Sequence, residues 1–245
     1  MSGVSASHLS GDVDPDDDSA VSQITSLQRL SASRLEGTVW EHWTVAGAVY
    51  RAVIRLGRWL GDVGITPNAL TYSSLGIAAL AAGFAATGHF VWATIWLLVS
   101  GSCDLLDGVI ARETGQASAW GALLDSSVDR VADALPMLGI VWFFYDMGAI
   151  AILVPVSAML SMFLLSYVRA RAESVGAKLP PLFMRRAERL VLLCASFLLS
   201  PFELSLGTLG LGSSIPLVLL GVGLIGVLSS VGVVCALVWA RRLLA

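Results

Sequence analysis

The stretch CDLLDGVIARETGQASAWGALLDSSVDR, residues 103–130, decides how this chain folds. It places Asp104, Asp107, Asp125 and Asp129 in a chain whose residues are 56% hydrophobic and only 13% charged. Soluble domains carry roughly 25% charged residues, so the composition predicts an integral membrane protein. Because a carboxylate at membrane depth is costly and is usually retained for function, these acids predict a functional site.

Apolar segments recur on both sides of this stretch. A membrane-spanning helix needs about 20 mostly apolar residues. Six segments approach or exceed that length: 67–87, 90–111, 119–145, 149–171, 186–201 and 214–240. The fifth of them ends at Pro201 or continues to about Leu206. Residues 40–63 set aromatic and aliphatic side chains against arginines, which favours a helix lying in the membrane interface over a seventh span. The predicted fold is an all-α integral membrane protein with one interfacial amphipathic helix and six transmembrane helices.

The ends of the chain and the connections predict its organisation. Residues 1–37 are acidic and rich in Ser and Gly, so we expect a disordered tail, whereas residues 38–245 form the membrane domain. The N-terminal residues contain no basic region followed by a short apolar run, so no cleavable signal peptide is expected. Lys and Arg are missing around 88–89, 146–148 and 203–213 and gather at the opposite ends of the spans. The positive-inside rule then places both termini on the cytoplasmic side of a plasma or inner membrane.

Spacing brings the four acids together. Asp104 and Asp107 are three residues apart, and Asp125 and Asp129 are four apart, so each pair shares one face of a helix. The connection between the two helices is short, which predicts antiparallel neighbours and a site just inside the cytoplasmic interface. Hard divalent cations such as Mg²⁺ take oxygen ligands and leave positions open for phosphate oxygens. No His or Cys joins the set, which disfavours zinc and copper.

Other interpretations of these acids stay open at this point. One is a set of buried ion pairs with Arg112 and Arg130, although two arginines cannot neutralise four carboxylates. Another is a cation or proton pathway, although the acids of a pathway would be spread over several depths. Asp133, one turn beyond Asp129, is placed to orient Arg130 or Asp129.

The neighbouring residues favour phosphoryl transfer. Gly108 and Gly121 allow a bulky group to approach the backbone closely. Arg112 stands at the predicted interface, where a guanidinium can bind a phosphate through two hydrogen bonds. Acids for a cation, glycines for access and an arginine for phosphate together indicate a pyrophosphate substrate.

The chain resembles the CDP-alcohol phosphotransferase family through the pattern D-x-x-D-G-x-x-A-R, eight residues, G-x-x-x-D-x-x-x-D over residues 104–129. The resemblance implies that the four aspartates hold two divalent cations, Mg²⁺ or Mn²⁺, and that Asp129 is also the general base. It implies CDP-diacylglycerol as the donor and a homodimer as the assembly. The nucleotide contacts would be Asn68, Thr71, Gly108, Ala111, Arg112, Ser118 and Gly121. For Asn68 the alternative is a helix cap.

A second pattern concerns the alcohol that accepts the phosphatidyl group. Five arginines lie within residues 166–190, where they would hold an anionic acceptor, although the positive-inside rule also requires basic residues here. The patterns S-Y-x-x-A-R-A-E-x-x-G and R-x-E-R-L resemble the phosphatidylinositol-phosphate synthases of the family, in which Lys is common at the position of Arg169. This implies inositol 1-phosphate as the acceptor, bound by Ser166, Arg169 and Arg186.

Three other functions stay open for this sequence. A phosphatidylglycerophosphate synthase using glycerol 3-phosphate is the closest of them, because its acceptor is also an anionic polyol phosphate. A transporter and a catalytically inactive scaffold fit less well, because the set of four acids is complete and is clustered near one face. The expected partners are the donor CDP-diacylglycerol, an anionic polyol phosphate acceptor, membrane lipid and a second copy of the chain, and nucleic acid is not expected.

Overall fold

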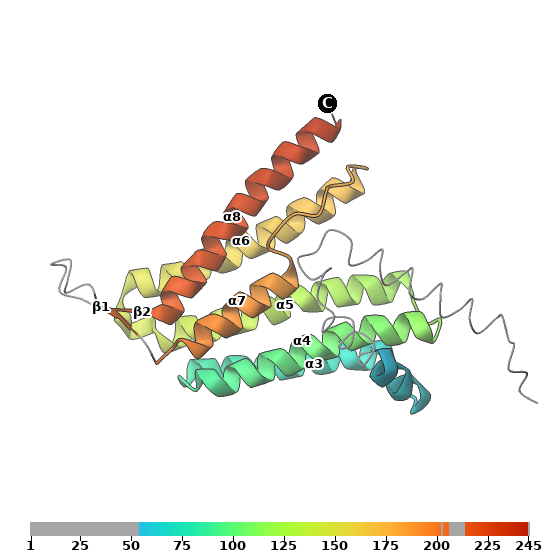
Figure 1. Ribbon diagram of the computed structural model, residues 1–245, viewed down its shortest axis with the longest axis horizontal. Coiled ribbons are helices and arrows are strands. Elements are labelled where there is room, and N and C mark those ends of the chain that lie inside the picture. The colour runs from blue at the N-terminus through green and yellow to red at the C-terminus, as the bar shows by residue number, and fades with distance from the viewer. Residues whose placement is uncertain (1–53, 202, 206–213, 245) are drawn as a thin grey trace, which may run out of the picture. The chain divides into compact units, whose positions relative to one another are not determined.

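The computed structural model describes residues 54–201, 203–205 and 214–244, so the predicted tail and residues 40–53 of the predicted interfacial helix lie outside the described residues. Residues 54–62 are helical. The elements that follow are α3 (Pro67–Ala86), α4 (Phe90–Glu113), α5 (Ala119–Phe143), η1 (Tyr145–Met147), α6 (Ala149–Ser174), α7 (Arg186–Leu198), β1 (Glu203–Ser205), β2 (Ser214–Pro216) and α8 (Leu217–Leu244) (Figure 1).

Capping side chains set the starts of the helices near the acids. The hydroxyl of Thr66 accepts a hydrogen bond from the backbone N–H of Ala69 at 3.3 Å, which caps α3. Ser118 caps α5 in the same way, accepting from the N–H of Gly121 at 3.0 Å. These caps satisfy N–H groups that have no partner within a helix. Asn68 lies inside α3, so its alternative role as the helix cap is wrong.

The helix α7 is shorter than the predicted fifth span, 186–201. It has 13 residues, which extend about 20 Å, whereas the hydrocarbon core of a bilayer is about 30 Å thick. The helix ends at Leu198, ahead of Pro201, which disfavours helical backbone in the residue before it. The chain then forms the antiparallel pair β1–β2. The continuation to about Leu206 is therefore wrong, and the last helix starts at Leu217 instead of residue 214.

Four helices, α3, α4, α6 and α8, are long and apolar enough to cross a membrane. The chain is thus an integral membrane protein whose described part is almost entirely helical. Helix α5 has 25 residues, but Asp125, Asp129, Arg130 and Asp133 interrupt its apolar surface. Six transmembrane helices, and an interfacial position for the helix at 54–62, stay predictions.

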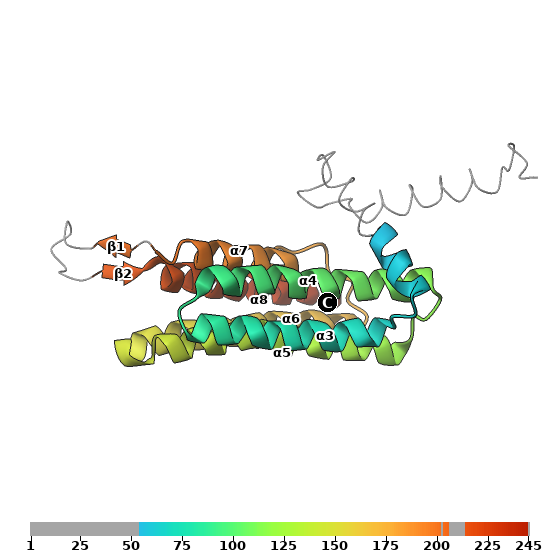
Figure 2. The ribbon, with the colours of Figure 1, turned by 90° about the horizontal axis from the view of Figure 1, so that it is seen from below.

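Successive helices run in alternating directions. The connections after α3, α5 and α7 lie at one end, and those after α4 and α6 lie at the other (Figure 2). Helix α3 packs against α4 and α5, α6 packs against α8, and α7 contacts both α4 and α8. The core between them is apolar and includes the fully buried side chains of Met137, Ile140, Leu165, Phe197 and Ile225. This packing brings charged residues of α4, α5 and α7 together.

Candidate functional site

Three of the four acids share one position in space. One carboxylate oxygen from each of Asp104, Asp107 and Asp125 lies within 4.8 Å of the other two. Asp107 is buried, and the other two are half-buried. Asp129 lies beside this trio, where its Oδ1 is 2.8 Å from Nη1 of Arg186. The convergence of α4 and α5 expected from the spacing is therefore present, with Asp129 paired to an arginine.

A hydroxyl on α3 fixes one of these acids. The Thr71 Oγ1 atom donates a hydrogen bond to Oδ2 of Asp107 at 2.6 Å and also lies 3.1 Å from the carbonyl oxygen of Pro67. Thr71 and Asp107 are only 3% and 4% exposed. A buried carboxylate is costly without such donors, so Thr71 sets the orientation of Asp107.

A cavity of about 190 Å³ opens beside Asp107 and Asp125, between α3, α4 and α5. It is lined by every residue predicted to contact a nucleotide: Asn68, Thr71, Gly108, Ala111, Arg112, Ser118 and Gly121. Residues from three helices thus meet at one place, as the sequence predicts. What they bind there stays a prediction.

The two glycines of the cavity make room for polar side chains. A Cβ atom on Gly108 would lie 3.1 Å from Nη1 of Arg112. A Cβ atom on Gly121 would lie 3.2 Å from Oγ of Ser118 and 3.7 Å from Oδ1 of Asn68. Both contacts are tight or close, so each glycine leaves space at the cavity wall where a polar group can meet a ligand.

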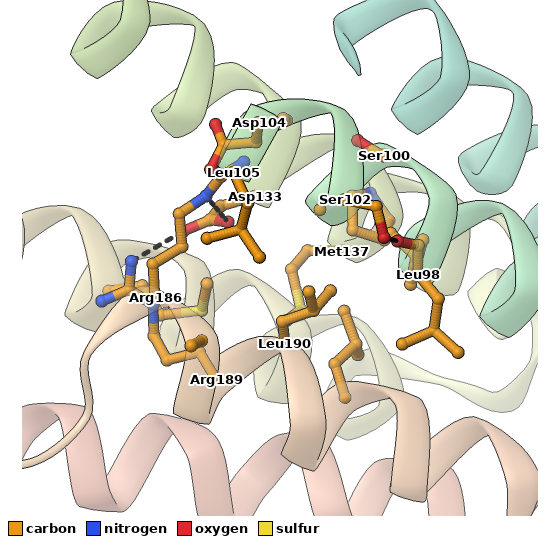
Figure 3. A pocket seen from close by; sticks show the side chains of 17 residues that line it. Leu98, Ser100, Ser102, Asp104, Leu105, Asp133, Met137, Arg186, Arg189 and Leu190 are labelled. Carbon is orange, nitrogen blue, oxygen red and sulfur yellow. Dashed lines mark hydrogen bonds and ion pairs between the residues drawn. The ribbon is translucent and has the colours of Figure 1, made fainter. Parts of the chain in front are cut away.

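The start of α7 reaches the acids from the other side (Figure 3). Arg186 forms ion pairs with Asp104, with Asp129, and with Asp133, whose Oδ1 lies 3.4 Å from the Arg186 Nε. Arg189 is 6% exposed, and its Nη2 lies 2.7 Å from Oδ2 of Asp133. Two arginines of α7 therefore neutralise part of the acidic charge.

This arrangement corrects two interpretations of the sequence. The acids do not pair with Arg112, which is exposed, and Arg130 donates to the backbone carbonyl of Ser126. Asp133 binds the arginines of α7, so its assignment as a residue that orients Arg130 is wrong. The sequence placed Arg189 only among the five arginines near a predicted acceptor and did not predict its ion pair with Asp133. Its signal was the spacing of three residues from Arg186, which puts both arginines on one helix face.

A larger cavity, of about 290 Å³, lies between α4, α5 and α7. Figure 3 shows Asp104, Asp133, Arg186 and Arg189 at one end of it, with Met137 and Leu190 beside them. Its remaining wall is mostly apolar. The cavity thus joins a charged end, next to the acids, to an apolar interior.

The three residues predicted to bind an acceptor do not line one cavity together, in contrast to the predicted nucleotide contacts. Arg186 lines the larger cavity. Arg169 is half-buried, and its Nη2 donates to the carbonyl oxygen of Phe183 at 2.5 Å. Ser166 is half-buried on α6, and neither it nor Arg169 lines the two cavities described. Their roles stay predictions.

The acids are chemically suited to a divalent cation. All three clustered ligand atoms are carboxylate oxygens, which hard cations such as Mg²⁺ and Mn²⁺ prefer. The Oδ1 atom of Asp104 is buried and has no hydrogen-bond partner among the described residues. A buried acceptor without a donor is unfavourable unless a cation or water completes its surroundings.

Residues 64–238 match the family described as CDP-alcohol phosphatidyltransferase. An uncharacterised protein of Aquifex aeolicus is 35% identical over 162 residues, which cover 65% of this chain and 82% of that protein. The phosphatidylinositol phosphate synthase of Mycobacteroides abscessus is 33% identical over 140 residues, 56% of this chain and 64% of that enzyme. The chain therefore spans less than two thirds of the length of this named relative.

A solved structure is also similar. It is the crystal structure of the phosphatidylinositol phosphate synthase of Mycobacterium tuberculosis with CDP-DAG bound. The TM-score is 0.67 at 25% sequence identity, and the match covers 78% of this chain and 94% of that one. The helical arrangement described here is thus found in a membrane enzyme of lipid synthesis.

Proposed function

The chain belongs to the CDP-alcohol phosphatidyltransferase family, and we propose that it transfers a phosphatidyl group from CDP-diacylglycerol to a hydroxyl of inositol 1-phosphate, releasing CMP. The observation that carries this proposal is the meeting of Asp104, Asp107 and Asp125 within 4.8 Å beside a cavity lined by all seven predicted nucleotide contacts. The name of the relative from Mycobacteroides abscessus and the CDP-DAG in the solved structure support donor and acceptor.

The four aspartates are proposed to hold two divalent cations, Mg²⁺ or Mn²⁺. Such cations, when bound, polarise pyrophosphate oxygens and stabilise charge on the attacking and leaving oxygens. Asp107 is oriented for this role by Thr71, and Asp104 offers a buried oxygen that has no donor within the described ranges. Arg186 already balances part of the charge of Asp104 and Asp129, which lowers the cost of keeping the acids ionised.

The donor is proposed to place its cytidine diphosphate in the smaller cavity. Arg112 would bind the pyrophosphate, because its guanidinium stands over Gly108 at the cavity wall. The polar side chains of Asn68, Thr71 and Ser118 and the small residues Gly108, Ala111 and Gly121 form the rest of the surface. The diacylglycerol part would remain among lipid, since α3 and α4 beside the cavity are apolar and long.

Proton transfer is proposed to fall to Asp129. Its carboxylate would take the proton of the acceptor hydroxyl as the new oxygen–phosphorus bond forms, and the phosphorus–oxygen bond to CMP breaks. Arg186 lies against Asp129 and lines the larger cavity, so it is placed to bind the phosphate of the acceptor. The resemblance adds Ser166 and Arg169 to the acceptor residues.

For the membrane topology, we propose six transmembrane helices, including α5 and α7, and an interfacial helix over about 40–63, within a domain of residues 38–245. Helices α3 to α8, six in the part of the chain that the structure describes, run in alternating directions, which is compatible with six successive crossings (Figure 2). The aspartates of α5 face the acid cluster or the arginines of α7, where they are tolerated in a spanning helix. Both termini would be cytoplasmic, and the functional unit would be a homodimer.

A panel of acceptors tests the function. The protein, purified in detergent, is supplied with labelled CDP-diacylglycerol, Mg²⁺ or Mn²⁺, and either inositol 1-phosphate, glycerol 3-phosphate, inositol or serine. We expect labelled phosphatidylinositol phosphate to form when inositol 1-phosphate is the acceptor. Product with glycerol 3-phosphate alone would instead identify a phosphatidylglycerophosphate synthase, and no product with any alcohol would refute the transferase.

A further inference from the structure

Both carboxylate oxygens of Asp133 form ion pairs with arginines of α7 (Figure 3). Its Oδ1 lies 3.4 Å from Nε of Arg186, and its Oδ2 lies 2.7 Å from Nη2 of Arg189. Asp133 sits one helical turn beyond Asp129 on α5, outside the four acids of the pattern. It therefore links the acid-bearing helix to the start of α7.

Arg189 holds this link rigidly. Its side chain is 7% exposed, and its Nη1 donates to the carbonyl oxygen of Met184 at 3.1 Å. Met184 has a φ of 60°, a backbone conformation that costs energy for a residue other than glycine. The buried arginine thus ties the segment before α7 to Asp133, which makes Asp133 a fixed counter-charge.

Arg186, by contrast, is shared between two sets of carboxylates. On one side are Asp104 and Asp129, which the proposed function assigns to divalent cations, and on the other is Asp133. A guanidinium and a cation compete for the same carboxylate oxygens, since each neutralises the same charge. Arg186 pairs with three carboxylates among the described residues. When Asp104 and Asp129 bind cations, the carboxylate of Asp133 still pairs with Arg186.

We propose that Asp133 is a positioning residue, which retains Arg186 at the edge of the acid cluster while Asp104 and Asp129 hold divalent cations. The inference rests on the proposed function, because it requires the cation site. Without the charge of Asp133, Asp104 and Asp129 are the ionic partners left to Arg186 among the residues that the structure describes. It then opposes cation binding, and it no longer stays beside the cavity in which an acceptor phosphate would lie.

The test is a double-mutant cycle read by Mn²⁺ binding, without substrate. Free Mn²⁺ is titrated by electron paramagnetic resonance against purified wild-type protein, Asp133→Asn, Arg186→Gln and the double variant. Asp133→Asn should weaken Mn²⁺ binding about tenfold in the wild-type background and less than about threefold in the Arg186→Gln background, a coupling in the usual range for residues in contact. Equal factors in the two backgrounds would overturn the inference, because Asp133 would then act independently of Arg186.

Three further measurements make the outcome unambiguous. Asp133→Glu keeps the charge and should bind Mn²⁺ within about threefold of the wild type. Asp146→Asn alters an exposed aspartate in η1 and should leave Mn²⁺ binding unchanged. If Asp133→Asn does not purify as folded protein, Asp133→Ser completes the same cycle. Failure of the wild type to bind Mn²⁺ would overturn the cation site and this inference together, whereas equal factors overturn the inference alone.

Discussion

The hydroxyl oxygen of Thr71 lies 2.6 Å from Oδ2 of Asp107. A threonine hydroxyl on α3 thus orients a buried carboxylate on α4. The contact joins the two parts of the proposed site, since Thr71 and Asp107 line the smaller cavity and Asp107 also belongs to the acid cluster. A change in this hydrogen bond should therefore affect folding and donor binding together.

Thr71→Val tests this contact, because valine has nearly the shape of threonine but lacks the hydroxyl. A buried acceptor that loses its donor costs about 1–3 kcal/mol, so we expect a lower midpoint of thermal unfolding in detergent with EDTA present. The KM for CDP-diacylglycerol should rise as well. Thr71→Ser keeps the hydroxyl and should retain most of the stability. Unchanged stability of Thr71→Val, with a loss confined to Thr71→Ser, would show that the methyl group matters and the hydrogen bond does not.

Gly108→Ala tests the placement of Arg112. The added Cβ atom would meet Nη1 of Arg112 at 3.1 Å, and the flexible guanidinium would move away from the cavity wall. Losing a hydrogen bond to a charged phosphate costs about 1.5–3 kcal/mol, so the KM for CDP-diacylglycerol should rise by about tenfold or more. Stability should change little.

The matched control for this variant is Gly76→Ala. Gly76 lies in α3, and apart from the adjoining backbone of its own helix no atom of the described residues lies within 4 Å of a Cβ atom added there. Alanine favours helix by up to about 1 kcal/mol over glycine, so this variant should be as stable as the wild type or more stable, with an unchanged KM. A similar rise in KM for both variants would contradict the role of Arg112.

The acid cluster could be predicted because it depends on local geometry. Spacings of three and four residues put each pair on one helix face, and a short connection makes the two helices neighbours. Ser118 and Gly121, which the family resemblance names as nucleotide contacts, lie in that connection or beside it and line one cavity. Sequence alone therefore predicted which side chains of α4 and α5 converge.

The partners of Asp133 could not be predicted in this way. Its position one turn beyond Asp129 indicated a role near the acids, but periodicity along α5 offers only neighbours on α5, such as Arg130. Arg186 and Arg189 come from a helix more distant in the sequence, and their contacts depend on how α7 packs against α4 and α5. The end of α7 was misjudged because apolar residues continue past Leu198, although the backbone does not stay helical.

Chelation tests the need for a cation. Excess EDTA should abolish CMP release, because the pyrophosphate charge is then no longer neutralised, and added Mg²⁺ or Mn²⁺ should restore it. EDTA saturated beforehand with Mg²⁺ is the control for effects of the chelator on the detergent or the lipid. Full activity in excess EDTA would contradict a metal-dependent transfer.

Asp129→Asn tests the general base. Asparagine keeps the shape of the side chain but cannot accept the proton of the acceptor hydroxyl, and loss of a general base typically lowers the rate by about 10²–10⁴-fold. CMP release should fall by that order, while the thermal unfolding midpoint stays close to that of the wild type. Asp146→Asn, in exposed η1, should leave the rate unchanged.

The same variant separates the proposed roles of Asp129 as base and as cation ligand. A lost ligand weakens cation binding, so saturating Mn²⁺ would restore the rate if ligation were its only role. A lost base leaves the rate low at any concentration of Mn²⁺. The 2.8 Å contact with Arg186 predicts a further difference. Without the charge of Asp129, Arg186 keeps Asp104 and Asp133 as partners, so the KM for inositol 1-phosphate should change less than kcat. In the Mn²⁺ titration of this variant, full recovery of CMP release at high Mn²⁺ would show that Asp129 serves only as a cation ligand and not as the base.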